Sequence, residues 1–404
     1  MNNKFLLILL SASFFLWGFL TSLNSILVPF LKDVFSLTYL DSMMIQVVFY
    51  VAPFLVCIPT AKFIKTFGYK KVMQISLLFL CIGCFLFYPA SKASSFYFFL
   101  FSILILAMGI AVIQVVANPY VVTISGTNDA TTNLTFCSFL NSAGTSTASY
   151  AGASIFLLAL STQTDISQLL SVTQKPYILL SILCILLIGL FQIFSKKEET
   201  KQVTQPTASK HSYFDVFKNK HFTLGSISMI IYIGVEVSIG TLLISYIKNG
   251  MHISMTSSTL GLLVSLYWGG SMLGRLLGSL VFKYIDSNTV LSINTLIAFI
   301  LVFCAIIQPN SFGLTCLILV GLFNSVMYPV IFSSSINKLG DMTEIGSAIL
   351  IMCGIGGAII PMIQASIADH FNVIISFSVP MLGYLFIHML MKKQKRYLVP
   401  ATSH

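Results

Sequence analysis

Apolar segments long enough to cross a lipid bilayer recur along the whole length of the chain. A transmembrane helix needs about 20 consecutive apolar residues, and twelve such runs follow one another in the sequence. Only 8% of the residues are charged, whereas a soluble domain carries about 25%. The sequence therefore predicts an all-α membrane protein whose spans lie roughly at residues 5–31, 40–63, 72–90, 95–123, 133–160, 177–195, 222–247, 257–282, 288–307, 311–335, 344–367 and 372–391.

The lysine and arginine residues fall mainly on one side of the predicted membrane. If the N-terminus is cytoplasmic, the opposite side holds only four of these 22 residues, namely Lys32, Lys92, Lys175 and Lys248. Cytoplasmic loops carry the excess of basic residues in membrane proteins. We therefore predict an even number of spans with both termini in the cytoplasm. The net charge of +10 then reflects topology and does not indicate a nucleic-acid partner.

A polar stretch, Ser195–His221, divides the chain into two halves that echo each other. Lys65 after the second span corresponds to Lys283 after the eighth, and Pro119 in the fourth span corresponds to Pro329 in the tenth. Such internal repeats are typical of duplicated transporters. We predict an N-terminal six-helix bundle over residues 1–195, a flexible cytoplasmic linker over 196–221, a C-terminal six-helix bundle over 222–391 and a cytoplasmic tail over 392–404.

Glu236 is the only carboxylate near the centre of an apolar run, which extends from Phe222 to Ile247. An acidic side chain at that depth costs about 2.5–3.5 kcal/mol on insertion scales. The cost is tolerable if the side chain faces a protein cavity and meets a partner, a cation or a substrate. We hypothesise that this helix lines a translocation pathway and that Glu236 couples a cation. The alternative is a protonated carboxyl that is bonded to a neighbouring helix for packing.

Several short segments, spread in order over the predicted spans, carry a family resemblance. They include FFLWGFLTSLNSILVPFL (14–31), VVANPYV (115–121), YIGVEVSIG (232–240), YWGGSMLGRLLGS (267–279) and GLFNSVMYPVIFS (321–333). The chain resembles the major facilitator superfamily and, within it, the fucose permease and glucose/galactose transporter family. The resemblance implies two pseudo-symmetric six-helix bundles, location in the inner (plasma) membrane, and transport of a hexose or 6-deoxyhexose such as glucose, galactose or fucose.

Two positions depart from the fucose-permease pattern within that resemblance. The first helix reads Leu23-Asn24-Ser25 where the family usually has an aspartate third. Gln114 stands where proton-coupled fucose permeases carry a glutamate before Ala-Asn-Pro. Gln114 and Glu236 both match the glucose/galactose branch, which includes sodium-coupled members. The coupling ion, Na⁺ or H⁺, and whether there is coupling at all, therefore stay open.

Amide side chains near mid-membrane are our candidates for sugar binding. Amides donate and accept hydrogen bonds, which suits the hydroxyls of a neutral sugar in a mostly apolar cavity. Gln114 and Asn118 are four residues apart and so share one face of a helix. The alternative for each amide is a structural bond between helices, a common use of Asn and Gln in membranes. The candidates are Asn24, Gln46, Gln114, Asn118, Asn141 and Asn324.

The eighth predicted span carries three further features. Trp268 lies deep in it, away from the interfacial position usual for Trp, and is our candidate aromatic face for a sugar ring. Arg275 lies at the cytoplasmic end, where it is either part of an inner gate or a positive-inside anchor. The spacing of Gly270, Gly274 and Gly278 predicts a close contact with a neighbouring helix.

The sequence shows no phosphate-binding loop, nucleophile motif or metal-ligand pattern, and its eight cysteines lie in apolar segments. We therefore predict a chain that is not an enzyme, needs no metal or cofactor, and has a sugar and membrane lipids as partners, without nucleic acid and as a monomer. The leading interpretation is a secondary transporter that moves a monosaccharide by cation symport and alternating access. Two alternatives stay open: an efflux carrier for cationic or lipophilic compounds, and a sugar sensor that does not transport.

Overall fold

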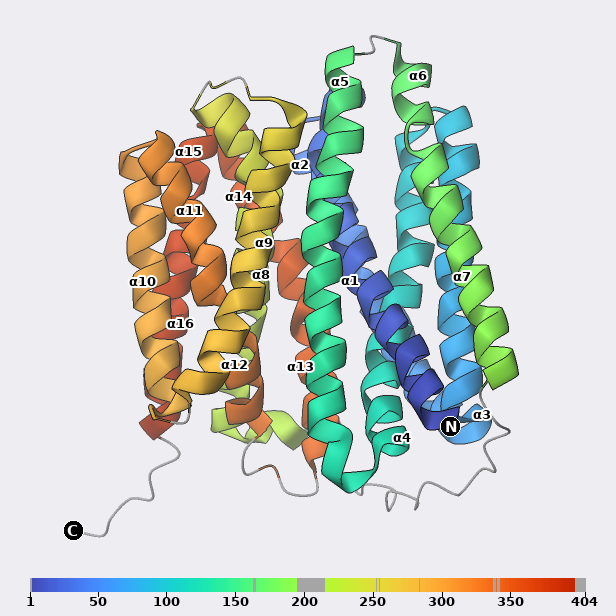
Figure 1. The fold of residues 1–404 in the computed structure, drawn as a ribbon. Helices are drawn as coiled ribbons and strands as arrows, with labels where there is room; N and C mark the ends of the chain where they lie inside the picture. Colours follow the sequence, from blue (N-terminus) through green and yellow to red (C-terminus); the bar gives the residue numbers. More distant parts are fainter. Residues whose placement is uncertain are drawn as a thin grey trace, which may run out of the picture. The chain divides into compact units, whose positions relative to one another are not determined.

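The computed structural model describes most of the chain as helices joined by short turns (Figure 1). Most of the predicted linker and the end of the predicted tail lie outside the described residues, over 196–214 and 397–404. The exact bounds predicted for the bundles, the linker and the tail therefore stay predictions. The described residues are 2–162, 165–194, 215–251, 253, 255–282, 284–336, 339 and 342–396.

Twelve helical segments among the described residues are long and apolar enough to cross a membrane. This confirms the predicted fold class and the predicted spans to within a few residues at most ends. The segments are Lys4–Val34, Tyr39–Ile64, Thr66–Lys92, Phe96–Val121, Phe136–Leu160, Ile166–Phe194, Lys220–Gly250, Ser257–Gly278, Ser287–Ile307, Ser311–Ile336, Ile349–His370 and Val373–Gln394.

The chain divides into two compact units, one of residues 1–205 with 256–265 and one of residues 206–255 with 266–404. In the first unit, α4 packs against α1 and α3, and α7 packs against α3 (Figure 1). Each of α3 and α4 holds two spans, and α3 turns at Gly68, whose φ of 77° suits glycine. The elements up to the linker are α1 (Asn2–Val34), α2 (Tyr39–Ser42), α3 (Met44–Lys92), α4 (Phe96–Gly152), η1 (Ala153–Leu157), α5 (Leu158–Thr162), α6 (Ile166–Ser171) and α7 (Gln174–Phe194).

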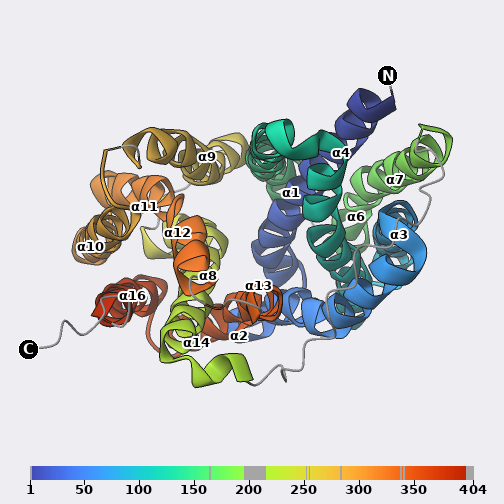
Figure 2. The same ribbon diagram turned by 90° about the horizontal axis from the view of Figure 1, so that it is seen from below.

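In the second unit, α8 packs against α12, α14 and α16, and α10 lies beside α11 and α16 (Figure 2). The elements after the linker are η2 (Asp215–Lys218), α8 (Lys220–Ser245), η3 (Tyr246–Gly250), α9 (Ser257–Val281), α10 (Ser287–Ile307), α11 (Ser311–Asn324), α12 (Met327–Ile336), α13 (Thr343–Met352), η5 (Cys353–Ile355), α14 (Gly356–His370), α15 (Val373–Ser376) and α16 (Ser378–Arg396).

The glycine stripe of α9 packs directly on the tenth span, as its spacing predicts. A Cβ atom at Gly270 would lie 3.1 Å from the backbone nitrogen of Leu322. A Cβ atom at Gly274 would collide with the Leu322 carbonyl, and one at Gly278 would collide with the Val326 side chain. Small residues allow two helix backbones to approach closely in a membrane. The stripe therefore holds α9 against the segment where α11 ends and α12 begins.

The tenth span is interrupted between α11 and α12, at Ser325 and Val326. Pro329 lies in the first turn of α12. Proline has no backbone N–H and its ring clashes with the carbonyl four residues earlier, which here belongs to Ser325. The helical bond to the Ser325 carbonyl is therefore lost, which favours a break at this point.

Side chains from other helices satisfy backbone carbonyls at this break. Asn294 of α10 donates its Nδ2 to the Phe323 carbonyl at 3.1 Å. Tyr232 of α8 donates its hydroxyl to the Asn324 carbonyl at 3.1 Å. Backbone polar groups at membrane depth need partners within the protein, because lipid tails offer none. Side chains of α8 and α10 therefore stabilise the break by bonding its free carbonyls.

Candidate functional site

One face of α8 carries Tyr232, Glu236 and Gly240 at intervals of four residues. Residues at this spacing lie above one another on a helix. The backbone neighbours Val235 and Val237 are buried, whereas the Glu236 side chain is only half-buried. The lone acid of the apolar runs therefore retains access to space outside the packed interior of the second unit.

Two polar groups lie near the Glu236 carboxyl. The Tyr232 hydroxyl is one turn earlier on α8 and donates its hydrogen to the Asn324 carbonyl, and the positive charge of Arg275 on α9 attracts the ionised carboxyl. Arg275 itself is exposed. A carboxyl at membrane depth is tolerated when such partners are present. The structure thus brings together the residues predicted for coupling and for gating.

One turn beyond Glu236 on the same face of α8, Gly240 packs against the aromatic pair Tyr267 and Trp268 of α9. Their rings meet edge to face, with centroids 5.1 Å apart. A Cβ atom at Gly240 would lie 2.7 Å from the Trp268 ring, so only glycine allows this approach. Trp268 is half-buried, and its indole Nε1 has no hydrogen-bond partner among the described residues. The Nε1 atom is itself buried, and a buried donor without a partner calls for an explanation such as a bound polar ligand or water.

Asn324, predicted as a sugar ligand, is fully buried at the end of α11. Tyr384 of α16 donates its hydroxyl to Asn324 Oδ1 at 2.8 Å, and Asn324 Nδ2 donates to the Tyr267 hydroxyl at 3.1 Å. Tyr267 in turn donates to the Glu236 carbonyl at 3.0 Å. The amide is therefore engaged with protein groups, and the alternative of a structural bond between helices fits its geometry.

Asn24 of α1 and Gln46 of α3 form a buried pair in the first unit. Asn24 Nδ2 donates to Gln46 Oε1 at 3.3 Å, and the two side chains are only 3% and 1% exposed. The Asn24 Oδ1 atom has no partner within the part of the chain that the structure describes. The pair thus links the first and second spans, and one acceptor, Asn24 Oδ1, has no hydrogen-bond partner among the described residues.

The remaining amides of the first unit are more accessible. Gln114 is half-buried and Asn118 is exposed on α4, and Asn118 Nδ2 donates to the Gln114 carbonyl at 3.4 Å. Asn141, also half-buried, donates its Nδ2 to the Phe14 carbonyl at 2.9 Å. Gln114 and Asn118 therefore lie together as their spacing predicts, and Asn141 uses one donor to fix α1 against α4.

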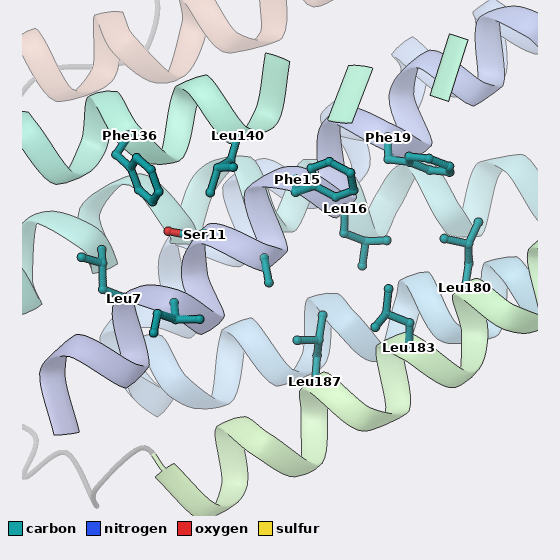
Figure 3. Close-up of a pocket in the computed structure, with 12 residues that line it drawn as sticks. Leu7, Ser11, Phe15, Leu16, Phe19, Phe136, Leu140, Leu180, Leu183 and Leu187 are labelled. Atoms are coloured by element: carbon teal, nitrogen blue, oxygen red, sulfur yellow. The ribbon is translucent and has the colours of Figure 1, made fainter. Parts of the chain in front are cut away.

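A cavity of about 620 Å³ in the first unit has a different chemistry. Figure 3 shows its wall of leucine and phenylalanine side chains from α1, α4 and α7, with Ser11 as the polar exception. The Ser11 hydroxyl already contacts Cys137 Sγ at 3.4 Å. None of the predicted site residues lines this cavity, and its apolar wall offers no hydrogen bonds to a sugar. The lining residues are Leu7, Ile8, Ser11, Ala12, Phe15, Leu16, Phe19, Phe136, Leu140, Leu180, Leu183 and Leu187.

Sequence reasoning missed the tyrosines around Glu236, namely Tyr232, Tyr267 and Tyr384. The spacing of Tyr232 from Glu236 was a usable signal, because residues four apart meet on a helix. Tyr267 and Tyr384 gave no such signal, since their partners lie on other helices. For metals, the described residues contain no group of three or more His, Cys, Asp or Glu side chains that is able to hold an ion.

Comparison with known proteins places the chain among membrane transporters. The family described as the Major Facilitator Superfamily matches residues 9–361. The glucose/galactose transporter of Brucella abortus biovar 1 (strain 9-941) is 35% identical over 386 residues, which cover 96% of this chain and 93% of the relative. The L-fucose-proton symporter of Escherichia coli (strain K12) is 27% identical over 384 residues, or 89% and 86% of the two chains.

A solved structure shows the same fold. The crystal structure of the E. coli fucose:proton symporter superposes with a TM-score of 0.69 at 22% identity, covering 98% of this chain and 99% of that one. Together with the twelve apolar helices, these matches confirm the predicted superfamily and a multi-pass membrane protein. The chain belongs to the Major Facilitator Superfamily.

Proposed function

We propose that the chain moves a monosaccharide, a hexose or 6-deoxyhexose such as glucose, galactose or fucose, across the inner membrane by cation-coupled alternating access. The names of the relatives, glucose/galactose transporter and L-fucose-proton symporter, support a sugar as the substrate. The observation that carries the proposal is the group on α8 and α9. There a half-buried carboxyl lies one helical turn from an aromatic ring whose N–H has no partner among the described residues.

The proposed sugar contacts are given for each unit by itself. In the first unit, Gln114, Asn118 and Asn141 offer amides to sugar hydroxyls, whereas Asn24 Oδ1 is a buried acceptor without a partner among the described residues. In the second unit, Trp268 covers the apolar side of the ring and donates its indole N–H to a hydroxyl. Gln46 and Asn324 serve these residues through the bonds described above and do not themselves face the sugar.

Glu236 is the proposed site of coupling, with Arg275 as the residue that responds to it. An ionised Glu236 attracts Arg275, and a bound proton or Na⁺ neutralises that attraction. Arg275 is then released when the ion binds, which is the step we assign to the gate. A proton is supported by the name of the L-fucose-proton symporter, and the gradient experiment below decides between H⁺ and Na⁺.

Counterflow of labelled sugars in proteoliposomes tests the substrate class. We expect exchange of at least one of glucose, galactose, fucose and mannose, and accumulation when an inward proton or sodium gradient is imposed. Size-exclusion chromatography of the same preparation shows that the protein is folded. A folded protein that exchanges none of the four sugars contradicts the proposal, and a screen of cationic and lipophilic compounds then tests efflux.

A further inference from the structure

A directional chain of hydrogen bonds leads from α16 through Asn324 to the residue that carries the candidate coupling group. The Tyr384 hydroxyl donates to Asn324 Oδ1, and Asn324 Nδ2 donates to the Tyr267 oxygen. Tyr267 must then donate its own hydrogen to the Glu236 carbonyl, because a carbonyl only accepts. Each bond fixes the direction of the next, and such chains strengthen one another where water is absent.

The members of this chain are shielded from any ligand. Asn324 and Tyr384 are 0% exposed and Tyr267 is 1% exposed. No face of the Asn324 amide is left to touch a sugar. Its influence on transport must therefore pass through the side chains that it bonds.

Close packing fixes the position of the Tyr267 hydroxyl. A Cβ atom at Gly240 would lie 3.2 Å from the Tyr267 ring, and one at Gly321 would collide with the Tyr267 carbonyl. The residue is thus held between α8 on one side and α11 on the other. Its hydroxyl has little freedom to serve a partner other than the Glu236 carbonyl and the Asn324 amide.

A second bond ties the same asparagine to α8. The Tyr232 hydroxyl donates to the Asn324 carbonyl, which lies where α11 ends and the tenth span breaks. Tyr232 is one turn from Glu236 on the same face of α8. The break in the tenth span and the Glu236 turn of α8 are therefore linked through Asn324 by both its side chain and its backbone.

We propose that Asn324 is a positioning residue, which holds the Glu236 turn of α8 through Tyr267 and so connects the break of the tenth span to the transport site. This inference rests on the proposed role of Glu236 in sugar transport. It replaces the prediction that Asn324 binds the sugar directly.

Conservative tyrosine variants test this chain of hydrogen bonds without leaving a large cavity in the core. Tyr267→Phe and Tyr384→Phe each remove one hydroxyl and keep the ring. We expect each to raise the KM of sugar counterflow about two- to tenfold, the value of one net hydrogen bond. The double variant should be no worse than the more severe single variant, because both changes interrupt one chain. Effects on KM that multiply in the double variant would overturn the proposal.

Tyr246→Phe is the matched control. Tyr246 is also fully buried in the second unit, and its hydroxyl donates to the Ala305 carbonyl at 2.6 Å, away from Asn324. We expect this variant to lose thermal stability like the others and to keep the wild-type KM. An equal rise in KM for Tyr246→Phe and Tyr267→Phe would mean that losing any buried hydroxyl has the same effect, which would contradict the proposal.

A readout that needs no sugar separates this inference from the proposed function. Dicyclohexylcarbodiimide modifies protonated carboxyls in apolar surroundings, and mass spectrometry of the Glu236 peptide gives the rate of modification. We expect the rate to change at least twofold in Tyr267→Phe and Tyr384→Phe and to stay unchanged in Tyr246→Phe. Equal rates in all four proteins overturn the positioning role, whereas failure of every sugar in the wild-type protein overturns the proposed function alone.

Discussion

At the scale of single residues, Glu236 lies inside the seventh span, but its side chain is only half-buried. The positive charge of Arg275 helps to make an acid tolerable at membrane depth, and the Tyr232 hydroxyl is one turn away on the same face of α8. The side chain nevertheless stays half-buried, which is the access that the proposed coupling needs. A carboxyl that served packing alone would gain nothing from that access, which is why we assign it to coupling.

Glu236→Gln tests this assignment, because it keeps the shape and removes the charge. We expect counterflow of sugar to persist, since exchange needs no net ion movement. Accumulation driven by a proton or sodium gradient should fall to the equilibrium level. Asp286→Asn is the control: Asp286 caps the exposed start of α10 through Thr289, and asparagine caps a helix equally well. Undiminished accumulation by Glu236→Gln would return this residue to a structural role.

Trp268 offers a second test at this scale through its indole N–H, which has no partner in the part of the chain that the structure describes. Trp268→Phe keeps an aromatic ring against Gly240 and removes the donor. We expect the KM for sugar to rise about two- to tenfold, the value of one net hydrogen bond. Trp17, in α1, is the other of the two tryptophans. A fluorescence change on sugar binding should survive Trp17→Phe and vanish in Trp268→Phe, and the reverse would place the sugar elsewhere.

At the scale of helices, the tenth span is where the second unit departs from regular structure. Pro329 removes one helical bond at the break, and two carbonyls there accept bonds from Asn294 and Tyr232. The glycine stripe of α9 packs against this same segment. Broken helices supported in this way often surround the binding sites of transporters, which agrees with the position of Asn324 beside Glu236.

Gly274→Ala tests how tightly α9 contacts the break. The added methyl group would collide with the Leu322 carbonyl and the Ser325 hydroxyl. We expect overpacking to cost about 1–3 kcal/mol of stability, seen as a lower melting temperature in detergent. Gly189→Ala in α7 is the matched control, because its Cβ would meet nothing within 4 Å. There the better helix propensity of alanine should leave the melting temperature equal or higher; equal losses in both variants would contradict close packing.

The helices follow from the sequence more readily than the contacts between them. Spans are predictable because crossing a bilayer depends on the length and polarity of one segment. The glycine spacing of α9 likewise predicts a contact, although it does not identify the tenth span as the partner. The role of Asn324 was not predictable, since a membrane amide binds a substrate or another helix with the same chemistry. Only the positions of Tyr267 and Tyr384 distinguish the two.

At the scale of the whole molecule, charge and helix count constrain the orientation together. The basic residues lie mainly in the loops of one predicted side, with Lys32, Lys92, Lys175 and Lys248 as the exceptions. Twelve spans among the described residues return the chain to the side where it began. We propose that both termini lie in the cytoplasm, because this orientation satisfies the positive-inside rule with this number of spans.

Cysteine labelling from outside the cell tests this orientation. Ala93 precedes the fourth span and Tyr284 follows the eighth, so five spans separate them and they must face opposite sides. Both positions are exposed, whereas the eight native cysteines are buried or half-buried and give little background. We expect a membrane-impermeant maleimide to label Ala93→Cys in intact cells and Tyr284→Cys only after permeabilisation. The opposite pattern would invert the protein, and labelling of both from outside would mean that one of the intervening helices does not cross.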